Sequence, residues 1–193
     1  MAEKAGKRKN NRGQELQDAA ATLFATQGYE KTTIREIAKA VNMLPGSAYY
    51  HFSSKQELLL SIYREGVARV CKKVDEAIAR ETDPWKRLAA GLGAHLSAIL
   101  DEQNYPPVLI SVVPSQVPEI AEELTEQRDR YEIRFTRLLD EIDLPEKADR
   151  RLLRLFLMGA VNWAEVWYDP GKSTPEDIAA AFIAFLTHPL KVG

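Results

Sequence analysis

One short stretch near the N-terminus carries side chains suited to contact with a polar, negatively charged polymer. Gly46 lets a ligand approach the backbone closely because it has no side chain, and the Ser47 hydroxyl can bond a base edge or a phosphate. Tyr49, Tyr50 and His51 are consecutive, so a helix would spread them around its axis and turn at least one of them outward. Together these features favour contact with a nucleic-acid duplex.

Two cationic residues flank this stretch. Lys55 opens a predicted long helix, where its charge adds to the positive helix N-terminus and makes a phosphate site. Arg35 can reach a phosphate or a guanine. We expect loss of Lys55 to weaken binding to all DNA sequences alike, whereas changes at Arg35 or Ser47 alter the sequence preference.

The charge of the chain is unevenly distributed. Residues 1–55 contain nine Lys and Arg against five Asp and Glu, a net charge of +4, whereas residues 56–193 have a net charge of −6. A basic segment on an acidic body indicates that the positive end meets a polyanion, with binding that falls steeply with salt. Charge alone leaves a second interpretation open, a solvated tail, because four of the positive charges fall within residues 4–9.

Short helices must position these side chains. Apolar residues recur at the helical period over residues 16–24 and predict a first helix. Thr33 and Glu36 have the capping-box spacing that begins a second helix. Asn42 suits a sharp turn, and Pro45 suits the first position of a third helix. Three short helices with a tight second turn predict a helix-turn-helix, whose third helix enters the DNA major groove.

The run of residues 32–59, with residues 19–24 and 28–29 upstream, resembles the DNA-binding signature of the tetracycline-repressor (TetR/AcrR) family. The resemblance implies an all-helical, dimeric regulator that represses transcription until a small molecule binds its C-terminal domain. Carried over by position, it implies duplex contacts at Thr33, Arg35, Pro45, Ser47, Tyr49, Tyr50, His51 and Lys55. Gly46 joins this predicted DNA-binding set for its lack of a side chain.

Three positions depart from the family pattern. Asn42 stands where the family usually has Gly, Leu44 where a capping Ser or Thr is common, and Ala48 where Leu is common. Leu44 removes a predicted N-cap, at a cost of about 1 kcal/mol. We expect these departures to change the operator sequence and to preserve the motif.

The rest of the chain is also predicted to be helical, which gives an all-α fold in three parts. Residues 1–10 are expected to form a basic disordered tail, residues 11–55 the helix-turn-helix DNA-binding domain, and residues 56–193 a larger helical domain for ligand binding and dimerisation. Residues 149–168 are expected to form one long helix. Four prolines between residues 105 and 118 predict short, bent helices there.

Those bends predict an apolar ligand pocket, because bent short helices leave cavities that straight, well-packed ones do not. His95 or Arg128 could supply a polar contact that orients the ligand. The alternative is that these residues form only the core. The expected lining comprises Leu92, Leu96, Ile99, Leu109, Val112, Val113, Tyr131, Phe135 and Trp163.

Residues 162–171 and 174–178 are similar to the junction before the last helix in a subset of the TetR family. Several members of that subset control fatty-acid or steroid breakdown and sense acyl-CoA thioesters. The resemblance therefore implies an acyl-CoA thioester as the first effector to test, with other apolar metabolites second.

The last two long helices are predicted to form a two-fold dimer. Residues 149–168 are apolar on more than one face, more than a single intramolecular contact needs. The alternative is a helix buried within one subunit. A dimer would present two recognition helices about 34–36 Å apart and so require a near-palindromic operator. The expected interface residues are Phe156, Ala160, Trp167, Phe182 and Phe185.

Other classes of protein are disfavoured. The single cysteine, Cys71, excludes an intrachain disulfide and a multi-cysteine metal site, and fits a reducing cytosol. No run of 18 apolar residues and no signal-peptide pattern is present. HExxH and GxSxG motifs are absent and the three histidines are scattered, so no metal, cofactor or catalytic residue is expected. The alternatives are a helical adaptor without a DNA role and, less favoured, a small helical enzyme. The adaptor leaves Tyr49, Tyr50, His51 and the basic N-terminus unexplained.

Overall fold

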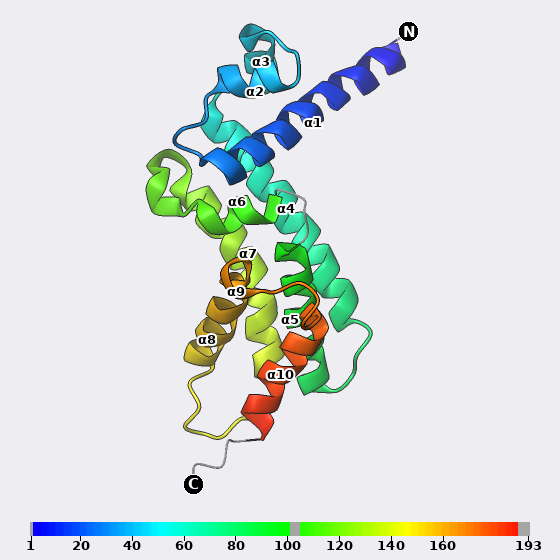
Figure 1. Cartoon of the computed structure of the whole chain (residues 1–193), viewed down its shortest axis with the longest axis vertical. Helices are drawn as coiled ribbons and strands as arrows, with labels where there is room; N and C mark the ends of the chain where they lie inside the picture. The colour runs from blue at the N-terminus through cyan, green and yellow to red at the C-terminus, as the bar shows by residue number, and fades with distance from the viewer. Residues whose placement is uncertain (1, 101–104, 189–193) are drawn as a thin grey trace. The chain divides into compact units, whose positions relative to one another are not determined.

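The structure is a computed structural model that describes residues 2–100 and 105–188 (Figure 1). Within these ranges the chain forms helices and no strands, which confirms the predicted all-α fold. No helix in the described part is long and apolar enough to cross a membrane. The helices are α1 (Ala2–Gln27), α2 (Ile34–Ala40), α3 (Pro45–His51), α4 (Lys55–Ile78), α5 (Pro84–Ile99), α6 (Tyr105–Ser111), α7 (Ala121–Asp140), α8 (Arg150–Asn162), α9 (Ala164–Trp167) and α10 (Pro175–Thr187), with short 3₁₀ turns at Pro114–Gln116 and Pro118–Ile120.

Backbone contacts divide the chain into two compact units. The first unit contains residues 1–67 and 103–127, and the second contains residues 68–102 and 128–193. The segment 103–127 therefore belongs with the N-terminal helices, although residues 56–193 were expected to form one functional domain. That functional division remains a prediction.

In the first unit, local signals start and end the helices that carry the recognition stretch. Gly28 ends α1 with a positive φ of 87°. The Thr33 hydroxyl accepts a hydrogen bond from the Glu36 amide while the Glu36 carboxylate accepts from the Thr33 backbone, as the capping-box spacing predicted. Pro45 begins α3. The core beneath these helices contains large, fully buried side chains, including Leu16, Phe24, Ile37, Leu58, Leu59 and Ile62.

Helix α6 is attached to the first unit by two tyrosines. The Tyr105 hydroxyl donates to Asp18 of α1 at 2.6 Å. The Tyr63 hydroxyl, from α4, lies 2.8 Å from the carbonyl oxygen of Leu109. Leu109 packs closely on Gly66, because a Cβ atom added at Gly66 would lie 3.2 Å from the Leu109 side chain. The helices of this proline-rich segment are short, as expected.

In the second unit, α5 packs along α10 and also contacts α8 and α9. The close approach of α10 depends on Gly93, where a Cβ would lie 3.4 Å from the Glu176 backbone. Ion pairs join the surrounding elements, among them Arg134 with Asp75 at 2.7 Å, Arg87 with Glu141 at 2.9 Å, and Arg154 with Glu132. Among the described residues of this unit, His95 is the one buried polar side chain in an otherwise apolar core.

Two expectations differ from the structure. Helix α1 is assigned from Ala2, within the stretch expected to form a disordered tail, and the tail itself stays a prediction. The polar composition of that stretch suggested disorder, but Ala, Lys, Glu and Arg are also strong helix formers. The helix expected over residues 149–168 is interrupted at Trp163, which separates α8 from α9. The interruption follows Asn162, whose side chain bonds inward to His95.

Candidate nucleic-acid interface

Helix α3 presents an exposed face of polar and aromatic side chains. Ser47 is exposed, Tyr49 is 54% exposed and Tyr50 is 70% exposed. Ala48, between them, is buried and fixes which face of the helix points inward. Exposing two tyrosines on a helix of only seven residues does not help the chain to fold. They suit the task of contacting base edges and phosphates.

The remaining predicted contacts lie around α3. Thr33, Arg35 and Gly46 are exposed, and Pro45 is partly exposed. His51 is half-buried, and its ring lies close to α1, 3.4 Å from the position of a Cβ on Gly13. Sequence reasoning thus chose residues that the first unit places on or beside α3. Whether each contacts DNA remains a prediction.

The turn between α2 and α3 is fixed by the backbone. Asn42 adopts a φ of +53°, and the Met43 amide donates to the Ala38 carbonyl at 2.8 Å. The asparagine thus adopts the left-handed conformation that the family usually gives to glycine. The Arg12 guanidinium, from α1, lies 3.4 Å from the carbonyl of Val41. These bonds hold α3 at a fixed angle to α2.

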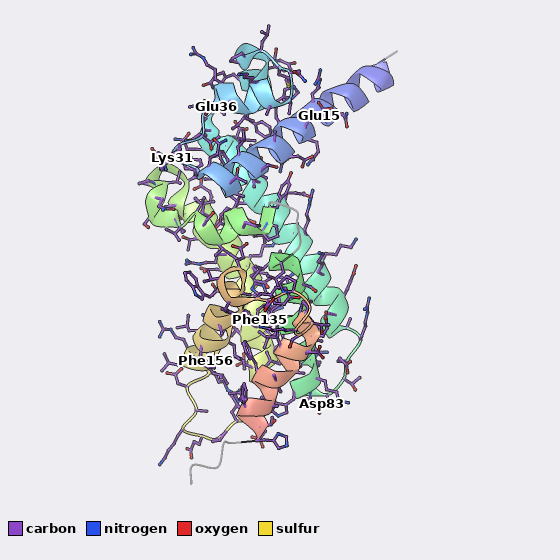
Figure 2. The ribbon with its side chains drawn as sticks, in the orientation of Figure 1. Glu15, Lys31, Glu36, Asp83, Phe135 and Phe156 are labelled. Atoms are coloured by element: carbon purple, nitrogen blue, oxygen red, sulfur yellow. The ribbon has the colours of Figure 1, made fainter. Side chains whose placement is uncertain are left out.

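A shallow open groove runs between α2 and α3, with a volume of about 430 Å³. Figure 2 labels Glu36, one of the residues that line it. Arg35 and Lys39 bring two positive charges to this groove. Its one carboxylate, Glu36, accepts hydrogen bonds from Thr33, which lower the pKa of Glu36 and keep it in the helix cap. The groove is therefore positively charged at its edge, as a phosphate-binding surface needs. It is lined by Arg35, Glu36, Lys39, Asn42, Met43 and Pro45.

Lys55 makes contacts that the sequence did not predict. Its ammonium donates to the carbonyl oxygens of Tyr29 at 2.9 Å and Thr32 at 3.1 Å. It also lies 4.1 Å from the centre of the Tyr29 ring. Lys55 therefore ties the turn after α1 to the start of α4, a structural task additional to the predicted phosphate contact.

In the second unit, His95 is the centre of a buried polar cluster. Its Nε2 lies 2.8 Å from Asn162 Oδ1, which can only accept, so Nε2 carries the hydrogen. Its Nδ1 then accepts from the Tyr131 hydroxyl. Burial lowers the pKa of His95 to about 4, so the ring is neutral. Both ring nitrogens are occupied, and Asn162, a lone amide in an apolar run, is a partner that sequence reasoning missed.

The predicted ligand-lining residues are divided between the two units. Phe135, labelled in Figure 2, is buried, as are Leu92, Leu96, Ile99 and Tyr131 of the second unit. Trp163 is 63% exposed, and Arg128 is exposed beside Glu132. The first unit contains the other three, half-buried Leu109, buried Val112 and exposed Val113. A pocket shared by these residues remains a prediction.

Large apolar side chains remain exposed on α8, α9 and α10 of the second unit. Phe156 (Figure 2) is 67% exposed and Phe185 is 59% exposed. Trp167 contacts Phe182, with ring centres 6.4 Å apart, and so links α9 to α10. Ala160 is partly exposed, and beside it Gly159 faces open space. A second copy of the chain could cover this surface, which is the predicted dimer interface.

The described residues contain no group of three or more His, Cys, Asp or Glu side chains that could hold a metal ion. Cys71 is buried, and burial raises the pKa of its thiol, so it is a poor nucleophile.

Two family models match the chain. One, described as "Bacterial regulatory proteins, tetR family", matches residues 16–62. The other, described as "Tetracyclin repressor-like, C-terminal domain", matches residues 81–190, more than half of the chain. The chain belongs to the TetR family. It is therefore a DNA-binding transcriptional regulator, as the run of residues 32–59 predicted.

Known proteins match this chain in sequence or in structure over most of its length. The HTH-type transcriptional repressor KstR2 of Rhodococcus jostii is 31% identical over 179 residues, covering 89% of this chain and 87% of the relative. The fatty acid metabolism regulator protein of Bacillus subtilis is 23% identical, covering 81% and 82%. The solved structure of AibR in complex with isovaleryl coenzyme A and operator DNA has the same fold, with a TM-score of 0.78 and 21% identity over 90% of this chain and 97% of AibR.

Proposed function

We propose that this TetR-family regulator is a cytoplasmic repressor that binds a near-palindromic operator as a two-fold dimer. The observation that carries the proposal is the outward face of α3, with exposed Ser47, Tyr49 and Tyr50 beside a groove edged by Arg35 and Lys39. Exposed apolar side chains on α8 and α10, such as Phe156 and Phe185, supply a surface for the second subunit. Two-fold symmetry in the protein requires matching symmetry in the operator.

We further propose that an acyl-CoA thioester releases the operator. The support comes from relatives: AibR was solved with isovaleryl coenzyme A, and a Bacillus subtilis relative regulates fatty acid metabolism. The buried apolar side chains of α5 and α7, including Leu96 and Phe135, suit the acyl chain. A ligand that prefers a conformer unable to bind DNA weakens binding by its affinity ratio for the two states.

The test is titration of the protein–operator complex with acyl-CoA thioesters of increasing chain length. A coupling free energy of about 1–3 kcal/mol weakens DNA binding roughly 5- to 150-fold. Free coenzyme A and the free fatty acids serve as controls and should act weakly. If no thioester releases DNA while an unrelated apolar compound does, the acyl-CoA assignment is wrong and the repressor assignment survives.

A further inference from the structure

Leu44, the residue before α3, is exposed in a position where folding gives no reason for leucine. Its side chain is 76% exposed, more than the other large apolar side chains that the structure describes as exposed. Its backbone lies at the N-cap of α3, with φ of −72° and ψ of 142°, and its side chain makes no capping hydrogen bond. Leucine at this site therefore contributes neither a cap nor a core contact.

A single exposed leucine is ordinary on a protein surface. The N-cap position makes Leu44 different, because Ser, Thr, Asp or Asn there would bond the free amides of the first helical turn. At Leu44 the backbone carbonyl, and not the side chain, accepts a hydrogen bond from the Ser47 amide, at 2.9 Å. Residues that break a local folding rule without a gain elsewhere in the fold are concentrated at functional sites.

The neighbours of Leu44 indicate what the side chain meets. Asn42, Met43 and Pro45 line the groove that carries Arg35 and Lys39, so Leu44 lies between residues of a surface that attracts a polyanion. Residues at the N-terminal end of a recognition helix contact base edges in the major groove. The apolar group on those edges is the 5-methyl of thymine, which apolar side chains contact.

We propose that Leu44 reads a thymine methyl group in each operator half-site and is thereby a specificity-determining residue. This inference rests on the proposed function, DNA binding by the outward face of α3. Contact with one methyl group excludes water from both partners and contributes roughly fourfold in affinity per half-site. The same contact selects thymine over cytosine at one position.

The test uses the full-length protein and an operator selected from a pool of duplexes. Each thymine of the operator is replaced in turn by uracil, which removes only the methyl group and leaves base pairing unchanged. For the unchanged protein we expect one thymine per half-site at which uracil weakens binding about fourfold. For Leu44→Ala the same uracil has no effect, and the response to uracil at the other thymines is the same as for the unchanged protein. Ile133→Ala, an exposed apolar residue of α7, is the matched control and keeps the full pattern.

A second variant separates recognition from folding. Leu44→Ser restores an N-cap and should raise the midpoint of thermal unfolding while removing the uracil effect. If no uracil substitution couples to Leu44, the inference is wrong, although DNA binding stands. If the protein enriches no duplex from the pool, the proposed function fails instead.

Discussion

The ammonium of Lys55 lies 2.9 Å from the backbone carbonyl oxygen of Tyr29 and also lies over the face of the Tyr29 ring. A residue expected to contact phosphate thus also ties together two parts of the first unit. Burial of Tyr29 raises the pKa of its own hydroxyl to about 12, so the ring that Lys55 covers stays neutral. The lysine joins the fold to the predicted DNA-binding surface.

Replacing Lys55 should therefore destabilise the protein as well as weaken DNA binding. Lys55→Met keeps the apolar stem and removes the charged donor, which leaves the carbonyls of Tyr29 and Thr32 without it. We expect a loss of about 1–3 kcal/mol in the free energy of unfolding, measured by urea denaturation. Lys31→Met, at an exposed lysine of the same unit, is the control and should change stability little. Equal stability of the two variants would mean that the Lys55 contacts contribute nothing to folding.

Stability should depend on pH through His95. The folded state holds its pKa near 4, whereas an unfolded histidine titrates near 6.5. The unfolded chain therefore binds the proton first as the pH falls. The contribution of neutral His95 to the free energy of unfolding is complete above about pH 6.5. It is lost as the pH falls from there to pH 4, and it amounts to up to about 3 kcal/mol.

The measurement is urea unfolding at pH 7.5 and pH 5 for the unchanged protein and His95→Gln. The variant should lose less stability than the unchanged protein over this interval, because glutamine does not titrate. An identical loss in both would show that other groups cause the pH dependence and that His95 is not held neutral.

The dimer surface is tested by placing a charge in its centre. Phe156→Glu should give a monomer in sedimentation equilibrium at micromolar concentration, because an uncompensated carboxylate would be buried against the second copy. Weak operator binding should follow, since two linked recognition helices are needed. Val113→Glu changes an exposed apolar residue of the first unit and should stay dimeric. A dimeric Phe156→Glu protein would place the interface elsewhere.

Changes at the recognition surface should separate two kinds of contact. Arg35→Ala and Ser47→Ala are expected to relax the base preference at the operator position that each residue contacts. The expected loss in binding free energy at that base is about 1–3 kcal/mol. Binding of random DNA should change less. Uniform weakening on all sequences would instead assign both residues to phosphate contacts.

Local signals in the sequence predicted most of the first unit. The Thr33–Glu36 spacing, Asn42 and Pro45 each act within a few residues, so the helix starts and the turn could be predicted without tertiary information. Because α3 is short and Ala48 faces inward, the exposure of Tyr49 and Tyr50 follows from helical geometry.

Contacts between distant residues could not be predicted in this way. His95 and Asn162 meet across 67 positions of sequence, and Lys55 meets Tyr29 across 26. An isolated histidine gives no sign of its partner, and a lysine at a helix start predicts a phosphate site as readily as a carbonyl contact. The interruption at Trp163 was missed for the same reason, because helical periodicity continues through it.

Charge reversal on the groove between α2 and α3 tests the central claim most directly. Full-length protein, the Arg35→Glu/Lys39→Glu variant and a Lys86→Glu/Lys147→Glu control with the same charge change in the second unit are each used to retain fragments of genomic DNA. We predict that the unchanged protein and the control enrich the same near-palindromic sequence, with affinity that falls steeply with salt. The groove variant should enrich nothing. Retention of the same fragments by the groove variant would contradict the assignment of DNA binding to this surface.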